Sequence, residues 1–220
     1  HDLSLDLDTT RQRYDNSQGQ IGTLDTPTTI SGYLPEQRFN REQVSLSHAW
    51  RFSGGVWDTS LTHNTTETVG RTIPAGTPGR TPGAPRTLES DNTLLDSKAV
   101  LDLGAHVLSV GGQWWEADMV DGVASLPYNQ RQWALFVEDE WRPIEPLALT
   151  FGLRHDKHSS FGGNASPRVY AVYDAAPGVT IKGGVSRAFK TPRLDQLHDG
   201  ITGYGAQGTN PFFGNPALRP

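Results

Sequence analysis

Residues 134–154 decide the fold, and they read ALFVEDEWRPIEPLALTFGLR. In the first part, the apolar Leu135 and Val137 occupy one parity, and the acidic Glu138 and Glu140 occupy the other. The part after the prolines, LALTFGLR, alternates in the same way. Side chains on a β-strand point alternately to opposite faces, so each part has one apolar and one polar face. Together they predict two strands joined by a tight turn at RPIEP.

The same alternation recurs along the chain, and a helical period fits none of these windows as well. We count about nine such segments: 3–8, 44–52, 57–69, 95–103, 108–114, 133–141, 147–156, 167–174 and 179–186. The sequence therefore predicts an all-β chain. Parity assigns Leu101, Leu135, Val137, Leu149 and Ile181 to an outer, apolar face, and Glu138, Arg154 and Lys182 to an inner one.

The connections alternate strictly between short and long. The short ones are 53–55, 104–105, 143–146 and 175–178, and the long ones are 14–37, 70–90, 116–130 and 190–220, with 159–165 the shortest of the long set. An up-and-down antiparallel sheet with its long loops at one end produces this order, which is typical of outer-membrane barrels. A soluble sandwich or propeller distributes its loop lengths less regularly.

The tryptophans are placed as in a membrane barrel wall. Trp50 and Trp57 flank a short turn, whereas Trp133 and Trp141 share a face eight residues apart. Eight residues span about 26 Å along a strand, or roughly 19 Å of height at a 45° tilt. This is slightly less than the ~25 Å band between two aromatic girdles. The alternative is an ordinary core that contains tryptophans.

Composition excludes several classes of protein. The 220 residues carry a formal net charge of −5 and no cysteine. An acidic balance argues against a nucleic-acid partner, and the lack of cysteine excludes disulfides and thiolate metal sites. No apolar run approaches the roughly 18 residues of a membrane helix. Because the chain begins and ends inside its own pattern, we expect a fragment.

The sequence contains few candidates for catalytic or metal-binding residues. His155 and His158 project to opposite faces of a strand, so one ion cannot bind both without a bulge. Glu138 and Glu140 share the polar face and resemble a hydrolytic carboxylate pair, but acidic residues that line a hydrated lumen explain them more simply. We therefore expect no catalytic residues, no metal site and no enzyme activity.

One loop stands out as a candidate ligand-binding segment. Residues 71–86 read RTIPAGTPGRTPGAPR, and the prolines and glycines prevent a helix or a regular strand. Arg71, Arg80 and Arg86 are its only charges. Guanidinium groups bind anions by charge and hydrogen bonding, so these three arginines are the candidate residues for binding an anionic ligand. The alternative is a solvated loop whose arginines touch lipopolysaccharide phosphates or nothing.

The last third of the chain carries a family resemblance. The pieces are SPRVY at 166–170, IKGGVSRAFKTP at 181–192 and GNPALRP at 214–220, and the hairpin at 134–154 is similar as well. In this order and spacing they resemble the barrel of TonB-dependent outer-membrane receptors, most of all the branch of ferric catecholate siderophore (enterobactin-type) and colicin receptors. The specific resemblance covers residues 130–220, and the earlier strands are compatible with it.

The resemblance implies a partial up-and-down transmembrane barrel, about nine strands of the roughly 22 in such a barrel. Residues 1–220 would be a fragment of the barrel domain, without the plug domain and the remaining strands. Ala217 departs from the family pattern, which often has an acidic residue there.

The family implies uptake of a ferric siderophore across the bacterial outer membrane, energised by the TonB complex through the plug. Iron would arrive with the ligand, so no intrinsic cofactor is expected. The implied partners are TonB, the siderophore, outer-membrane lipid and lipopolysaccharide, and also colicins or phage. Two other classes stay open: a general porin, which an upstream plug would exclude, and a soluble carbohydrate-binding module, which dependence on detergent would exclude.

Overall fold

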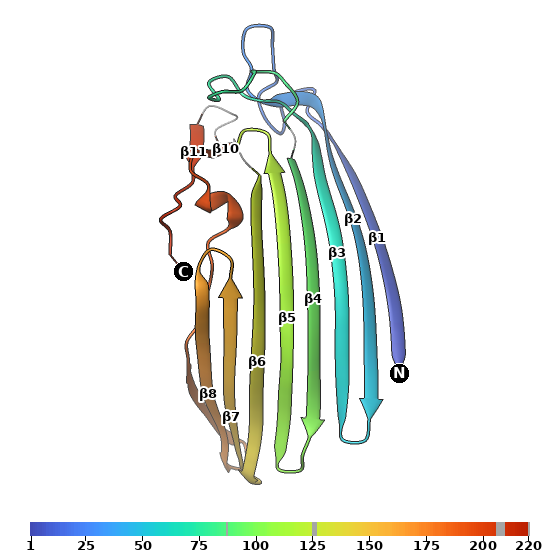
Figure 1. Cartoon of the computed structure of the whole chain (residues 1–220), viewed down its shortest axis with the longest axis vertical. Helices are drawn as coiled ribbons and strands as arrows, with labels where there is room; N and C mark the ends of the chain where they lie inside the picture. The colour runs from blue at the N-terminus through green and yellow to red at the C-terminus, as the bar shows by residue number, and fades with distance from the viewer. Residues whose placement is uncertain (87, 125–126, 206–209, 220) are drawn as a thin grey trace.

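The computed structural model describes residues 1–86, 88–124, 127–205 and 210–219 (Figure 1). Strands dominate it, together with one short 3-10 helix, η1. The elements are β1 (Asp2–Asp15), β2 (Tyr33–Phe52), β3 (Gly55–Arg71), β4 (Leu88–Asp102), β5 (His106–Asp121), β6 (Tyr128–Ile144), β7 (Leu147–His158), β8 (Gly162–Ala176), β9 (Val179–Ser186), η1 (Leu194–Leu197), β10 (Ile201–Gly205) and β11 (Asn210–Phe213). None of the described helical residues forms a segment long and apolar enough to cross a membrane.

Strands β1 to β9 form one antiparallel sheet in which each strand pairs with its neighbours in the sequence. This confirms the predicted up-and-down topology. Strands β10 and β11 form a separate hairpin, in which Ile201 pairs with Phe213 and the register shifts before Gly203. The sequence did not indicate this hairpin or η1, because their side chains show no sustained period.

The two faces of the sheet differ as the parity of the sequence predicts. One row of directly paired residues crosses six strands through Leu5, Leu46, Leu61, Leu95, Trp114 and Trp133. Leu149 pairs with Trp141, whereas Arg154 pairs with Phe136, so Leu149 and Arg154 lie on opposite faces. By the same register Leu101, Leu135, Val137, Leu149 and Ile181 share one face, and Glu138, Arg154 and Lys182 share the other.

The short turns lie at one end of the sheet and the long connections at the other (Figure 1). In the short turns Gly54 and Gly178 have φ of 88° and 78°, a conformation that glycine adopts without strain. The long connections are shorter than expected, and only residues 159–161 separate β7 from β8 where we predicted a loop over 159–165. We predicted a loop over 116–130, but β5 continues to Asp121 and β6 begins at Tyr128. The ladder extends because polar pairs such as Glu116 with Arg131 continue it beyond the apolar part of the strands.

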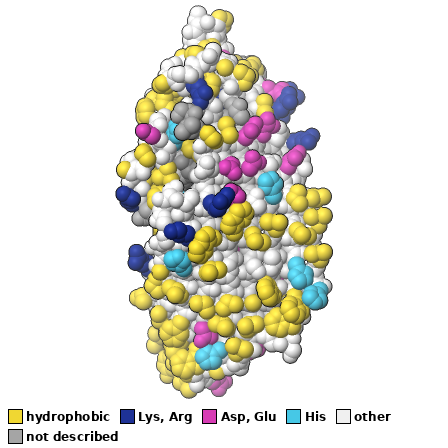
Figure 2. Space-filling view, in the orientation of Figure 1, with side chains coloured by type: hydrophobic (Ala, Val, Ile, Leu, Met, Phe, Trp, Pro, Cys, Tyr) yellow, Lys and Arg dark blue, Asp and Glu magenta, His cyan; other side chains and the backbone are white. Residues whose placement is uncertain are grey.

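The sheet is a single layer, and its apolar side chains are exposed. Leu135 and Ile181 are each 60% exposed, and Val185 is 76% exposed. Figure 2 shows hydrophobic side chains gathered toward the short turns and charged ones over the middle and the loop end. The hydrophobic cluster of buried residues lies instead among the long connections, where Ile73, Val123 and Ile201 pack together. The strands therefore depend on an apolar environment outside the chain.

We expect the 220-residue chain alone to aggregate in buffer without detergent. Both sheet faces are exposed, and β1 and β9 each leave one edge of backbone groups unpaired within the nine-stranded sheet. Size-exclusion chromatography and thermal melting followed by circular dichroism test this. A monomer that melts cooperatively in plain buffer would contradict the prediction.

Candidate functional site: the loop cap

The long connections come together at one end of the nine-stranded sheet (Figure 1). We call this region the loop cap and define it as residues 16–32, 72–86, 122–124 and the hairpin of β10 and β11. Its centre is the cluster of Ile73, Val123 and Ile201, to which Ala84 and Tyr204 add partly buried surface. Three separate connections supply these side chains, so the cap forms only when the strands are correctly registered.

The first connection is shaped by a buried asparagine. Asn16 is fully buried, and its Oδ1 accepts hydrogen bonds from the backbone N–H groups of Ile21 (2.8 Å) and Gly22 (3.2 Å). Its Nδ2 donates to the carbonyl of Gly22 at 3.0 Å, and its backbone N–H donates to the carbonyl of Pro35 at 2.7 Å. One side chain therefore holds the loop against the start of β2.

Asp25 joins this loop to the next connection. Its Oδ1 accepts from the backbone N–H groups of Ser31 (2.9 Å), Gly32 (2.8 Å) and Tyr33 (3.3 Å). Its Oδ2 accepts a hydrogen bond from the hydroxyl of Thr72. A carboxylate that accepts several N–H bonds orders a turn strongly. The β1–β2 connection is thereby fixed to the arginine-containing loop.

The arginine-containing loop is compact. Thr72 and Pro85 form an isolated β-bridge, and Ile73 donates to the carbonyl of Ala84 at 2.8 Å. The Thr77 hydroxyl lies 2.6 Å from the Tyr204 hydroxyl of β10. The prolines and glycines thus give turns around a single bridge, in agreement with the expectation of no regular strand.

The structure gives the three predicted arginines different environments. Arg86 is 7% exposed, and its Nε and Nη2 donate to the two carboxylate oxygens of Asp121 at 2.8 and 2.6 Å. Arg71 is half-buried, with its Cζ 3.9 Å from the centre of the Tyr33 ring. Arg80 is exposed and donates to the carbonyl of Ala124. Arg71 and Arg86 therefore hold the loop in place, and Arg80 presents its charge to solvent.

Burial and neighbouring charges shift the pKa values of two groups beside the loop cap, Arg71 and Tyr128. Burial lowers the pKa of the Arg71 guanidinium, and the nearby Tyr33 hydroxyl opposes this shift. Burial, together with the charges of Asp121 and Asp195, raises the pKa of the Tyr128 phenol to about 12. Both groups lie beyond the apolar part of their strands. The Tyr128 phenol is therefore neutral, and its hydroxyl has no hydrogen-bond partner among the described residues.

Arg80 borders a pocket of about 360 Å³ between its loop and the β10–β11 hairpin. The lining residues are Pro78, Gly79, Arg80, Val123, His198, Asp199, Gly200, Ile201 and Phe213. They offer a guanidinium, an imidazole, a carboxylate and an aromatic ring beside the apolar side chains of Val123 and Ile201. Sequence reasoning missed His198 and Phe213, because only the folding back of the C-terminal segment brings them near residue 80.

The other candidates from the sequence have ordinary partners. His155 lies with its ring 5.8 Å from that of Trp133 on the outer face. His158 is buried on the inner side and accepts a hydrogen bond from the N–H of Ser160 at 3.0 Å. Within the described parts of the chain, His, Asp and Glu side chains form no group of three that could hold a metal ion.

The inner face carries a connected polar network. Glu138 pairs with Arg168 at 3.2 Å and Glu140 pairs with Arg142 at 2.8 Å, so each carboxylate has its own cation. Arg154 bonds both Asp156 (3.0 Å) and Gln113 (3.0 Å). The network continues through Gln113 to Asp96 and through Asp156 to Gln132. On this face Glu138, Glu140 and Asp156 therefore each have an arginine partner within a polar network.

The family described as TonB dependent receptor-like, beta-barrel matches residues 1–220. The chain is 31% identical to the iron-regulated outer membrane virulence protein of Vibrio cholerae, over 100% of the chain and 32% of that protein. It is 30% identical to the ferric enterobactin receptor of Pseudomonas aeruginosa, over 82% of the chain and 29% of that protein. The chain thus spans about a third of the length of the curated relatives it matches.

Solved structures agree with these relatives. The siderophore receptor PirA of Pseudomonas aeruginosa superposes with a TM-score of 0.67 and 28% identity, over 83% of this chain and 33% of that one. A ferric enterobactin receptor mutant from the same organism, solved with enterobactin, gives a TM-score of 0.69 and 25% identity, over 83% of this chain and 31% of that one.

We predict that Arg86→Ala loosens the loop cap while Arg80→Ala does not. Removing Arg86 leaves the Asp121 carboxylate buried without its partner, which costs about 3–5 kcal/mol. In the complete protein, hydrogen exchange at the amides of Ile73 and Gly83, which are bonded within this loop, should accelerate strongly in the Arg86 variant alone. Equal protection in the two variants would show that the buried pair does not hold the loop.

Proposed function

Because the chain belongs to the family of TonB-dependent receptor β-barrels, we propose that it forms adjacent strands of the barrel wall in a receptor for a ferric siderophore. Residues 1–220 are then one part of a barrel domain whose plug and remaining strands lie in other parts of the protein. The proposal favours a gated receptor over a general porin or a soluble carbohydrate-binding module.

The single-layer sheet with two unlike faces carries the proposal. Its exposed apolar face would pack against lipid instead of a protein core, and each strand pairs with its chain neighbours, with register shifts in only three of the eight ladders of this sheet. The barrel wall lies in the outer membrane, with the loop cap at its outer end and the short turns at its inner end. The polar network of Arg154, Asp156 and Glu138 faces the lumen.

We propose that the loop cap captures the ligand. A ferric catecholate is anionic and aromatic, and the pocket beside Arg80 offers a cation together with the rings of His198 and Phe213. Arg71 and Arg86 support this pocket by holding the loop, and Arg71 also adds positive charge near it, whereas Asp121 neutralises Arg86. Relatives named as ferric enterobactin receptors support the choice of ligand.

The proposed action is binding and gated passage without bond making. The TonB complex would act through the plug, and iron is cargo that enters with the siderophore. No step needs a catalytic side chain or a resident cofactor from this chain. Lipid and lipopolysaccharide around the apolar face, and colicins or phage at the loops, belong to the same proposal as further partners.

The loop cap should raise the association rate of the ligand. Replacing Arg71, Arg80 and Arg86 by Gln together should slow the binding of ferric enterobactin several-fold at low salt, because electrostatic steering acts mainly on association. The rates should converge at high salt, where charges are screened beyond about 3 Å. Stopped-flow measurements on the complete receptor test this.

Two further variants separate steering from loop structure. Arg80→Gln alone removes an exposed charge without breaking the buried pair, and we expect it to slow association in the same salt-dependent way. Arg142→Gln makes the same charge change near the short turns and should leave association unchanged. If association stays unchanged in the triple variant at both salt concentrations, the loop has no part in capture.

We predict that neighbouring residues of β5 tolerate charge unequally. Val110 pairs with Val137 on the apolar face, whereas Ser109 pairs with Glu138 on the lumen face. In the complete protein in lipid vesicles, Val110→Arg should lower the free energy of unfolding by about 2–4 kcal/mol, and Ser109→Arg should lower it far less. Urea unfolding in vesicles measures both, and equal costs would contradict the assignment of faces.

A further inference from the structure

A second pocket lies on the lumen face of the sheet, next to the loop cap. Its volume is about 490 Å³, which is within the range of small-molecule sites, roughly 300–1,000 Å³. Lumen-face residues of β4, β5 and β6 form one side of it, and residues of the C-terminal segment between 191 and 202 form the other. We call it the inner pocket. It shares the segment from Asp195 to Thr202 with the pocket beside Arg80, whose lining includes His198 and Ile201.

The strand side of the inner pocket has an apolar floor with polar flanks. Trp115, Ala117 and Met119 alternate along β5 and therefore share its lumen face. Ala117 pairs directly with Asn92 of β4 and with Gln130 of β6. The Trp115 Nε1 lies 3.4 Å from the Asn92 Oδ1, so the indole ring is held next to this amide. A ligand in the pocket would meet an aromatic and aliphatic floor between two amides.

The charged groups around the inner pocket are already paired. Arg193 donates from Nε and Nη2 to the two carboxylate oxygens of Asp195, at 3.0 and 2.5 Å. Asp121 forms an ion pair with the buried Arg86. The described lining of the inner pocket therefore offers no free cation to an anionic ligand such as a ferric catecholate.

The other polar groups of the inner pocket favour a ligand that carries hydroxyls. Asn92 and Gln130 supply amides, and Ser90, Thr191 and Thr202 supply hydroxyls. An amide or a hydroxyl offers both a hydrogen-bond donor and an acceptor. Ligand hydroxyls also offer both, whereas the oxygens of an iron-bound catecholate can only accept. The inner pocket is therefore suited to a neutral, hydroxyl-rich group.

A buried hydroxyl beside the inner pocket has no partner. Tyr128 is 5% exposed, and its Oη makes no hydrogen bond with the described residues. Tyr128 pairs directly with Met119 of the floor, and its ring packs edge-on against the ring of His198, with 5.0 Å between the ring centres. A ligand oxygen bonded to this hydroxyl would recover the cost of leaving a buried donor unpaired.

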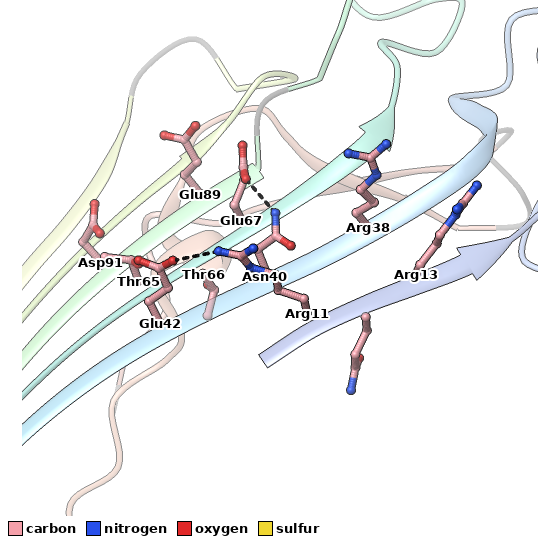
Figure 3. A pocket seen from close by; sticks show the side chains of 11 residues that line it. Arg11, Arg13, Arg38, Asn40, Glu42, Thr65, Thr66, Glu67, Glu89 and Asp91 are labelled. Atoms are coloured by element: carbon pink, nitrogen blue, oxygen red, sulfur yellow. Dashed lines mark hydrogen bonds and ion pairs between the residues drawn. The ribbon is translucent and has the colours of Figure 1, made fainter. Parts of the chain in front are cut away.

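The groove in Figure 3 has a different character. It lies over β1 to β4, and its labelled side chains are mostly charged, as Arg11, Glu42 and Glu89 are. Opposite charges there face each other, and Arg11 lies 3.8 Å from Glu42. The described lining of this groove contains no aromatic ring. Of these two cavities, only the inner pocket combines an aromatic floor with neutral polar groups.

We propose that the inner pocket binds a neutral sugar ring. A pyranose has C–H groups on its face and hydroxyls around its rim, which match the floor at Trp115 and the amides and hydroxyls beside it. The sugar is either a free saccharide or a substituent carried by the siderophore. The proposal does not depend on the proposed capture of a catecholate, which uses the pocket beside Arg80.

The test uses the complete receptor in a polyoxyethylene detergent, which has no sugar in its headgroup, and methyl β-glucoside as the probe. Trp115→Ala should weaken the binding of this sugar about tenfold, because the ring loses its aromatic contact. Trp114→Ala is the matched control, since Trp114 is the neighbouring residue on the outer face, and it should leave the affinity unchanged. Isothermal titration calorimetry measures both. If no sugar binds to the original protein, or if both variants lose affinity equally, the proposal is overturned.

A second variant keeps the test independent of misfolding. Thr191→Val removes one hydroxyl at almost constant shape and should weaken sugar binding several-fold. Thermal melting followed by circular dichroism should match the original protein, which shows that the barrel is folded whether or not it binds a siderophore. Unchanged sugar affinity in both Thr191→Val and Trp115→Ala would also overturn the proposal.

Ferric enterobactin with and without glucosyl substituents identifies the source of the sugar. If the substituted complex binds the original protein more tightly and Trp115→Ala removes this gain, the sugar arrives on the siderophore. If substitution gives no gain while methyl β-glucoside binds, the ligand is a free saccharide.

Discussion

The backbone hydrogen-bond ladder of the nine strands is the constraint on which the rest of the structure depends. In hydrocarbon, each unpaired N–H or C=O costs several kcal/mol, so a strand that crosses a membrane must pair along its whole length. Neighbour-to-neighbour pairing from β1 to β9 meets this need without a second layer. The apolar side chains can then face outward, where lipid takes the place of a protein core.

The ladder also explains why the buried polar groups gather in the loop cap. The register of the strands fixes where each connection begins and ends. Residues that are distant in the sequence can therefore come into contact in the loop cap. The buried ion pair of Arg86 and Asp121 joins the ends of β5 and of the loop after β3. The side chains of Asn16 and Asp25 accept hydrogen bonds from backbone N–H groups in the β1–β2 connection, which have no partner in the sheet ladder. Buried side-chain contacts therefore hold the cap together.

Much of the fold could be predicted from the sequence because it depends on local periodicity. The period of two placed Leu149 and Arg154 on opposite faces, and the alternation of short and long connections predicted the strand order. The loop cap depends on contacts between distant segments. Arg80, Val123 and Phe213 meet in one pocket, and no local pattern relates them. Likewise, the exposure of Arg80 and the burial of Arg86 follow from the position of Asp121, which lies 35 residues after Arg86.

Charged side chains are paired differently on the different surfaces of the molecule, and the surroundings of each surface explain the difference. On the lumen face, cations and carboxylates pair with each other, as Arg168 does with Glu138. In the loop cap, Arg86 is paired and buried. Above the apolar face, like charges oppose each other directly, Arg13 with Arg38 and Glu67 with Glu89. Neighbours on the same face offset this repulsion, because Glu36 forms ion pairs with both Arg13 and Arg38 and Asn40 donates a hydrogen bond to Glu67.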